Sequence, residues 1–269
     1  MTQPPWQRQW RILFWQRIRT LVTILGLTGV VITCAWASGM LDVRLFWRLL
    51  GRLDFLIQQT LPPDFSPFSR HWLQPLRDTL IMSVVGTAGG VVLAVPMALL
   101  AARGLSPHRL LPAPVRSFLG GLRTIPELLL AIGLVILLGP GMVAGCVALM
   151  IHSAGMLGKF YHEIMEHAQP EPLMAVRSCG GNRFQVITHG VIPQVWPQLI
   201  DVTLFRWECN IRAAVVLGII GAGGIGSEII IAQRVLKYQE LSALILIILA
   251  LVILVDWCSS FLRKRMVAA

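Results

Sequence analysis

Four charged residues lie close together within an apolar stretch in the last third of this chain. They are Asp201, Arg206, Glu208 and Arg212. An unpaired charge inside a membrane costs at least about 2.5 kcal/mol even on insertion scales, so each charge must have a partner or face water. Glu208 and Arg212 are four residues apart, in the order that favours an ion pair along a helix. Either Arg206 and Arg212 line a passage that favours an oxyanion, or the charges form structural pairs or lie at the external rim.

A second group of polar residues lies earlier in the chain. Arg123 and Glu127 are also four apart, and Pro126 suits a first helical turn, so they form a structural pair or contact a substrate. His152 and Ser153 either attract an anion or belong to a helix end. Glu127, His152 and Glu228 could also serve a membrane-embedded enzyme, although no paired catalytic spacing joins them.

The glycine run Gly218–Gly226 matches the dinucleotide-binding pattern G-x-G-x-x-G. No βαβ unit surrounds it and its flanks are apolar, which excludes a nucleotide site of that kind. The glycines instead indicate close helix approach and a bend at a gate, or a packing corner without a moving part. The residues that we keep as candidates for a pathway or its gate are Arg123, Glu127, His152, Ser153, Arg206, Glu208, Arg212, Gly221, Gly223, Gly224 and Gly226.

Composition places the chain in a membrane. Hydrophobic residues make up 55% and charged residues 13% of the 269, against about 25% charged in soluble domains. The net charge of +10 comes mostly from basic residues at the ends of apolar segments, which indicates membrane orientation rather than nucleic-acid binding. The five cysteines are widely spaced and mostly lie in apolar runs, which predicts reduced, buried thiols rather than disulfides or a metal site.

Apolar segments predict six membrane crossings. Residues 1–20 carry arginines and a stripe of Trp6, Trp10, Phe14 and Ile18, which predicts an interfacial helix. Small residues every fourth position from Gly86 to Ala102 predict close packing of another helix. The expected spans are residues 21–37, 79–102, 118–138, a short one at 142–157, a segment from 194 with a broken or re-entrant piece at 218–226, and 241–262; a surface helix is expected at 45–61.

Basic residues also predict the orientation. With six crossings, 14 of the 23 lysine and arginine residues fall on the side of the two termini. The positive-inside rule therefore places both termini in the cytosol, together with the polar segment 170–193.

The segment 170–193 is the longest polar stretch between the later spans. It predicts a helix, a break at Gly180-Gly181 and a second short helix that ends at Pro193. Its pattern A-x4-G-x12-P resembles the cytoplasmic E-A-A-x3-G-x9-I-x-L-P loop of ABC importer permeases, with Met174 at the Glu position, Gly190 at the Ile and Ile192 at the Leu. That loop docks on the ATP-binding subunit. The residues that the resemblance assigns to this contact are Met174, Ala175, Arg177, Gly180, Gly181, Arg183 and Pro193.

Three further stretches narrow the resemblance. They look like those of phosphonate permeases of ABC importers, a group that includes transporters of phosphite and hypophosphite. The likeness covers about residues 79–265. The stretches are Arg123–Glu127, His152–Lys159, and Asn210–Ala214 followed by Val216–Gly218 and Gly221–Gly226.

The resemblance implies an all-α, type I importer permease of the inner membrane that acts as a homodimer. Residues 1–78 would hold the interfacial helix, first span and periplasmic loop, and residues 79–265 the permease core. Two partner ABC subunits would bind ATP and Mg, and a periplasmic protein would deliver the substrate. The chain itself lacks a G-x4-G-K-[ST] loop and is predicted to hydrolyse nothing and to hold no cofactor.

Three alternatives stay open at this point. One is a methionine-type importer permease, which shares a glycine run before its last span. The second is the membrane-embedded enzyme mentioned above. The third is a secondary transporter, against which the lack of two similar halves argues.

Overall fold

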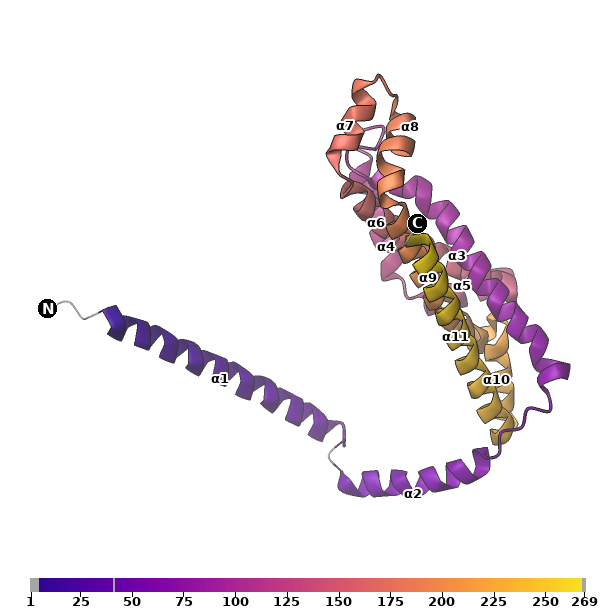
Figure 1. The fold of residues 1–269 in the computed structure, drawn as a ribbon. Coiled ribbons are helices and arrows are strands. Elements are labelled where there is room, and N and C mark those ends of the chain that lie inside the picture. The colour runs from indigo at the N-terminus through magenta and orange to yellow at the C-terminus, as the bar shows by residue number, and fades with distance from the viewer. Residues whose placement is uncertain (1–4, 41, 268–269) are drawn as a thin grey trace. The chain divides into compact units, whose positions relative to one another are not determined.

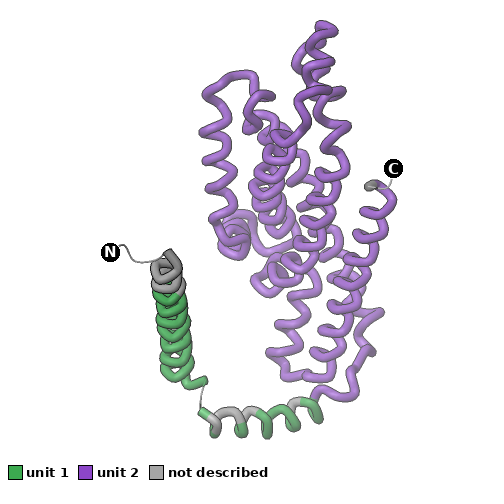
Figure 2. Tube along the Cα trace, turned by 60° about the vertical axis from the view of Figure 1, so that its left-hand side comes forward, with its two compact units in different colours: residues 1–59 green, residues 60–269 purple. Residues whose placement is uncertain are grey.

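The computed structural model describes residues 5–40 and 42–267, and every regular element in these ranges is helical. The chain divides into two compact units, residues 1–59 and 60–269 (Figure 2). The all-α prediction is confirmed. The functional division into residues 1–78 and a permease core of residues 79–265 stays a prediction.

The first unit contains two helices, α1 (Pro5–Ala37) and α2 (Val43–Thr60). The predicted interfacial helix and the span after it belong to one continuous helix, α1, rather than to two separate helices. The interfacial position of its first part stays a prediction. No proline or glycine pair interrupts the sequence near residue 20. Its part Phe14–Ala37 is long and apolar enough to cross a membrane. The side chains of Trp6 and Trp10 lie outside the described residues. The helix α2 agrees with the one predicted at 45–61.

The second unit is organised around α3 (Leu73–Ala101), α6 (Met142–Glu166) and α9 (Ile192–Leu217), which pack on one another (Figure 1). A short π-helix, Phe68–Trp72, extends α3 upstream of the predicted start. The predicted close approach along α3 is confirmed. A Cβ atom on Gly86 would lie 2.5 Å from Leu149 Cβ, and one on Gly90 would lie 2.5 Å from Ser153 Cβ. Only glycine allows α6 to pack this closely.

The third apolar segment is broken, so the span expected at 118–138 is not a single straight helix. It forms α4 (Pro112–Thr124) and α5 (Glu127–Leu138), with a bend of 85° between them. Pro126 explains the break, because a proline drives the preceding residue out of the helical region. Ile125 is accordingly extended, with ψ 118°.

The turn Gly139–Gly141 ends α5 as predicted, but the following helix is longer than expected. A helix long and apolar enough to span begins at Met142 as predicted, but it is not short, since α6 continues to Glu166. Residues 159–166 contain no proline or glycine, and Tyr161 and Met165 are buried in the bundle, which favours continuation.

The polar segment begins with a helix, α7 (Pro170–Ser178), as predicted. The second short helix does not end at Pro193. Instead α8 (Arg183–Gln185) and a π-helical segment, Val186–Val191, run directly into α9. Pro193 lacks the N–H of a regular helix, and the chain passes this point through the wider π-helical turns rather than stopping.

The glycine run breaks the next apolar segment, as predicted. A short π-helical piece, Gly218–Ala222, is followed by α10 (Ile225–Arg234) after a bend of 56°, and α11 (Tyr238–Val267) ends the chain. Within the described residues, four helices are long and apolar enough to cross a membrane, or up to six if each bent pair counts as one span.

Candidate functional site

A buried polar cluster lies where α3, α5, α6 and α9 meet. Its centre is Arg206 of α9, only 4% exposed. Arg206 Nε donates to Ser153 Oγ at 3.0 Å, and Nη2 lies 3.3 Å from Glu127 Oε2 and 2.8 Å from His152 Nδ1. We call Thr87, Glu127, His152, Ser153, Arg206 and Asn210 the polar cluster. It unites four residues that the sequence marked as pathway candidates.

Asn210 extends the cluster by one helical turn. It is fully buried, and its Nδ2 donates to Thr87 Oγ1 at 2.7 Å and to Ser153 Oγ at 2.9 Å. Thr87 in turn donates to the carbonyl oxygen of Ser83 at 2.6 Å. Buried polar groups are costly unless they are bonded, so this network favours one register of α3, α6 and α9.

The charges of the polar cluster balance. Glu127 faces both Arg206 and His152, with its Oε2 3.1 Å from His152 Nδ1. That nitrogen accepts from Arg206 or donates to Glu127, depending on its tautomer, but it does not do both at once. With the carboxylate in place, the guanidinium is neutralised. An oxyanion would therefore have to compete with Glu127 in this arrangement.

Three other predicted residues lie outside the polar cluster. The predicted pair of Arg123 with Glu127 does not form, because the bend at Pro126 separates them, and Arg123 instead lies over the ring of Phe160 at 5.9 Å. The predicted pair of Glu208 with Arg212 is also wrong. Both residues make ion pairs with α11 instead. Glu208 Oε1 lies 3.0 Å from Arg263 Nη2, and Arg212 Nη1 lies 3.6 Å from Asp256 Oδ1.

Two members of the polar cluster were missed by sequence reasoning. Asn210 lies one turn after Arg206, so the helical period alone points to it. Thr87 lies beside the small residues of α3 and carries no charge. The sequence around it therefore does not mark it as a site residue.

The glycine run forms a tightly packed corner. The N–H of Gly141 donates to the carbonyl of Gly221 at 2.9 Å, and Gly221, Gly223 and Gly224 have positive φ angles. A Cβ atom on Gly226 would collide with the carbonyl oxygen of Val215. These glycines are therefore required for packing and for the backbone turn, whether or not the corner moves.

A side chain from another helix completes this corner. Thr79 of α3 is buried, and its Oγ1 accepts a hydrogen bond from the N–H of Ile225 at 2.8 Å. Ile225 is the first residue of α10, whose free N–H groups need such a partner. The contact ties the start of α10 to α3.

Residues 170–191 form a two-helix arm at one end of the bundle (Figure 1). The first helix ends in a Schellman motif: Gly180, at φ 77°, donates to the Arg177 carbonyl at 3.0 Å, and Gly181 to that of Val176 at 3.0 Å. The second begins with a capping box. The N–H of Gln185 donates to Asn182 Oδ1 at 2.9 Å, and the N–H of Asn182 donates to Gln185 Oε1 at 2.8 Å. Both ends are thus fixed by local hydrogen bonds.

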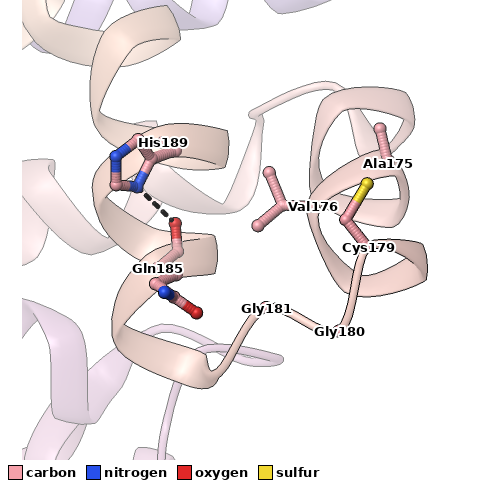
Figure 3. A pocket seen from close by; sticks show the side chains of 7 residues that line it. All are labelled: Ala175, Val176, Cys179, Gly180, Gly181, Gln185 and His189. Carbon is pink, nitrogen blue, oxygen red and sulfur yellow. Dashed lines mark hydrogen bonds between the residues drawn. The ribbon is translucent and has the colours of Figure 1, made fainter.

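The arm carries a hollow of about 550 Å³ between its helices (Figure 3). Ala175, Cys179 and Gly180 line it from the first helix and its cap, and Gln185 and His189 from the second. At Gly190, a Cβ atom would lie 3.3 Å from the Cα of Leu173, so the helices pack closely there.

Exposed apolar side chains accompany the hollow. Met174 is 53% exposed and Phe184 is 73% exposed. These two side chains leave apolar surface on the arm available for contact with another molecule.

The arm connects directly to the bundle. Gln194 accepts from the N–H of Gln169 at 2.9 Å, which closes the base of the arm. Arg183 Nη1 donates to the Pro107 carbonyl at 2.8 Å, which joins the arm to the loop after α3. Because the second helix of the arm runs into α9, it shares a continuous backbone with Arg206.

Family comparison agrees with this architecture. Residues 90–268 match the model of the binding-protein-dependent transport system inner membrane component. The chain belongs to this family. It is therefore a multi-pass inner-membrane transport permease and a transport subunit rather than an enzyme.

Two curated relatives of this permease carry transport names. The chain is 43% identical over 252 residues to the phosphite transport system permease protein PtxC of Stutzerimonas stutzeri, covering 94% of this chain and 90% of PtxC. It is 33% identical over 254 residues to the phosphate-import permease protein PhnE of Mycolicibacterium smegmatis, covering 93% of this chain and 48% of that protein. The permease thus spans about half of PhnE. These findings confirm the family that the motifs indicated.

The fold is similar to that of a solved importer. A chain of the MetNI methionine ABC transporter in an inward-facing conformation superimposes with a TM-score of 0.66 at 19% identity, covering 75% of this permease and 98% of that chain. This likeness supports the importer-permease fold alone.

Proposed function

We propose that this permease is the membrane-spanning subunit of an ATP-driven importer of phosphite, phosphonate or a similar phosphorus oxyanion. The observation that carries the substrate class is the identity of 43% to a phosphite permease over 94% of the chain. The methionine-type alternative has only the fold in its support, at 19% identity. The enzyme alternative has no support from the relatives, which are transport proteins.

The two-helix arm is the proposed contact with an ATP-binding subunit. Support comes from its exposed apolar side chains and the hollow between its helices. The residues proposed for the contact are Met174, Ala175, Arg177, Gly180, Gly181, Arg183 and Pro193. Most are exposed or border the hollow, and Pro193 lies where the arm joins α9. The ATP and Mg would be bound by that partner and not by this chain.

The continuity of the arm with α9 suggests how motion would be transmitted. Arg206 lies 13 residues after Pro193 along the helix, which corresponds to about 20 Å. A displacement of the arm would move α9 as a lever and would change the distance from Arg206 to Glu127 on α5. The ion pair between them is therefore our candidate for a pathway gate, with the glycine corner as the proposed pivot.

The other pathway candidates receive different roles. Arg123, Glu208 and Arg212 are proposed to hold helices together, since each contacts a neighbouring helix. His152 and Ser153 are proposed to face the pathway when Arg206 moves. This assignment keeps Arg206 and Glu127 as the charged pair nearest the passage.

Two copies of the permease are proposed to enclose one pathway, with both termini in the cytosol and a periplasmic protein delivering the substrate. The predicted homodimer and orientation rest on the family resemblance and on the distribution of basic residues. Residues 1–78 and 79–265 remain the proposed peripheral and core regions.

A transport assay tests this function. The permease, its candidate ATP-binding subunit and binding protein are reconstituted in vesicles, and uptake of labelled phosphite, methylphosphonate, phosphate and methionine is measured with and without ATP. We expect ATP-dependent uptake of at least one phosphorus oxyanion and none of methionine. Methionine uptake, or uptake that needs no ATP, would contradict the proposal.

A further inference from the structure

A second hollow lies beside the arm, at the end of the bundle where α3 ends. It has a volume of about 410 Å³ and lies between the loop after α3 and the start of α4. Its lining includes Arg103, His108, Arg109 and Arg183, together with Pro112 and Ala113 at the start of α4. We call it the basic hollow.

The basic hollow is strongly positive. Three arginines line it, and no aspartate or glutamate is among its lining residues. Within the described part of the chain, these three side chains have no ion pair with a carboxylate. The nearby Glu166 is already committed to Arg116 and to the backbone N–H of Arg103. Like charges gathered without counter-charges repel one another, so an anion would stabilise this arrangement.

The geometry positions these groups from two separate segments. Arg103 and Arg109 come from the loop, whereas Arg183 comes from the arm. The hydrogen bond from Arg183 Nη1 to the Pro107 carbonyl holds its guanidinium over the loop. The first turn of α4 also borders the basic hollow, and a helix N-terminus carries a positive partial charge.

Arginine side chains suit one class of ligand in particular. The planar guanidinium binds phosphate oxygens through two parallel hydrogen bonds, and several arginines can share one tetrahedral anion. The basic hollow lies directly beyond the C-terminal end of α3, a helix that is long and apolar enough to cross a membrane. If α3 spans the bilayer, these arginines lie near the lipid head groups.

We propose that the basic hollow binds a phosphate group, supplied by an anionic lipid or by free phosphate, and that this group links the arm to the α3–α4 loop. Because Arg183 belongs to the arm, occupancy would restrain the arm relative to the bundle. Any consequence for transport rests on the proposed function, whereas the binding itself does not.

Binding is tested on the full chain in nanodiscs. The first measurement is equilibrium dialysis with labelled inorganic phosphate in neutral phosphatidylcholine discs at low salt. The second is native mass spectrometry after exposure to phosphatidylglycerol. The variants are R183Q and R109Q, with R183K to keep the charge and R234Q as a matched control, since Arg234 is an exposed arginine on α10 outside the hollow.

We expect saturable phosphate binding or retained phosphatidylglycerol, weakened about tenfold or more in R183Q and R109Q. R234Q should bind like the wild type, and R183K should bind between the two. If R183Q and R109Q lose only the binding of inorganic phosphate, the ligand of the basic hollow is a free anion. If they lose only the retention of phosphatidylglycerol, the ligand is a lipid phosphate.

Two outcomes would overturn the proposal. One is that neither probe binds, and the other is that R234Q weakens binding as much as R183Q does. Retained size-exclusion and circular-dichroism profiles show that the variants fold. Uptake by the wild-type permease is measured separately in the transport assay. Uptake would persist if only the proposed binding in the basic hollow were wrong, so this failure is distinguishable from failure of the proposed function.

Discussion

Arg206 Nη2 lies 3.3 Å from Glu127 Oε2, and this ion pair joins the long helix α9 to the short helix α5. The guanidinium is almost fully buried, whereas the Glu127 side chain is 32% exposed. The pair thus sits at the edge of the bundle interior, with one partner reachable from outside. Its position on the helix that continues from the arm gives it the proposed role in gating.

The first prediction concerns this pair. E127Q keeps the side-chain volume but leaves Arg206 without a counter-charge, which should lower the free energy of unfolding by about 1–3 kcal/mol. Chemical unfolding in detergent micelles measures it. The matched control is E163Q, because Glu163 forms a half-exposed pair with Lys159 at 3.5 Å that should contribute at most about 0.5 kcal/mol. Equal stability of E127Q and E163Q would argue against the pair.

The second prediction concerns Asn210. N210A removes the hydrogen bonds to Thr87 and Ser153, and hydrogen bonds between membrane helices contribute about 0.6 kcal/mol on average and at most about 1.7. A double-mutant cycle of N210A with T87A should give a coupling energy in this range. The same cycle with T188A, on the arm, should give none. A coupling near zero for Thr87 would mean that the hydrogen bond is not formed.

The third prediction tests the close approach of α3 and α6. G90A would place a methyl group 2.5 Å from Ser153 Cβ, so the helices must separate, at a cost of about 1–3 kcal/mol. G133A is the control within another helix, because its new Cβ would meet nothing within 4 Å. It should leave stability unchanged or raise it by up to about 1 kcal/mol. If the two variants behave alike, α3 and α6 do not pack as described.

The fourth prediction concerns the rigidity of the arm. N182A removes the side-chain cap of the second arm helix and should cost about 1 kcal/mol locally. N182D retains an oxygen acceptor and should preserve the cap. We expect ATP-dependent uptake to fall in N182A, while the melting temperature of the bundle and the function of N182D stay near wild type. Normal uptake in N182A would show that the cap is not needed for coupling.

Sequence patterns predicted the helical segments better than their connections. The break at Gly139–Gly141 follows from the glycines themselves, and the small residues of α3 follow from their spacing. The bend after Thr124 was missed because one proline can also begin a helix without breaking a span. The continuity of the helix through Pro193 was also missed. A proline was expected to end the helix, but here the preceding π-helical segment accommodates it.

The candidate site was predictable in its residue types but not in its pairing. Spacing along one helix favoured Glu208 with Arg212, yet both residues face α11 and find partners there. Helical periodicity says which residues share a face but not which other helix covers that face. Ion pairs between distant segments, such as Arg206 with Glu127, therefore required the structure.

The most direct test of the central claim is the labelling of Cys179 by a membrane-impermeant maleimide. The predicted burial of the thiols is wrong for two cysteines, because Cys179 is exposed on the polar arm and Cys34 is exposed on α1. A C34S background therefore leaves Cys179 as the exposed thiol. In inverted and right-side-out vesicles, we expect labelling only from the cytosolic face, and protection when the ATP-binding subunit is assembled. Labelling from the periplasmic face, or labelling unchanged by the ATP-binding subunit, would contradict the claim that residues 170–193 couple this permease to its motor.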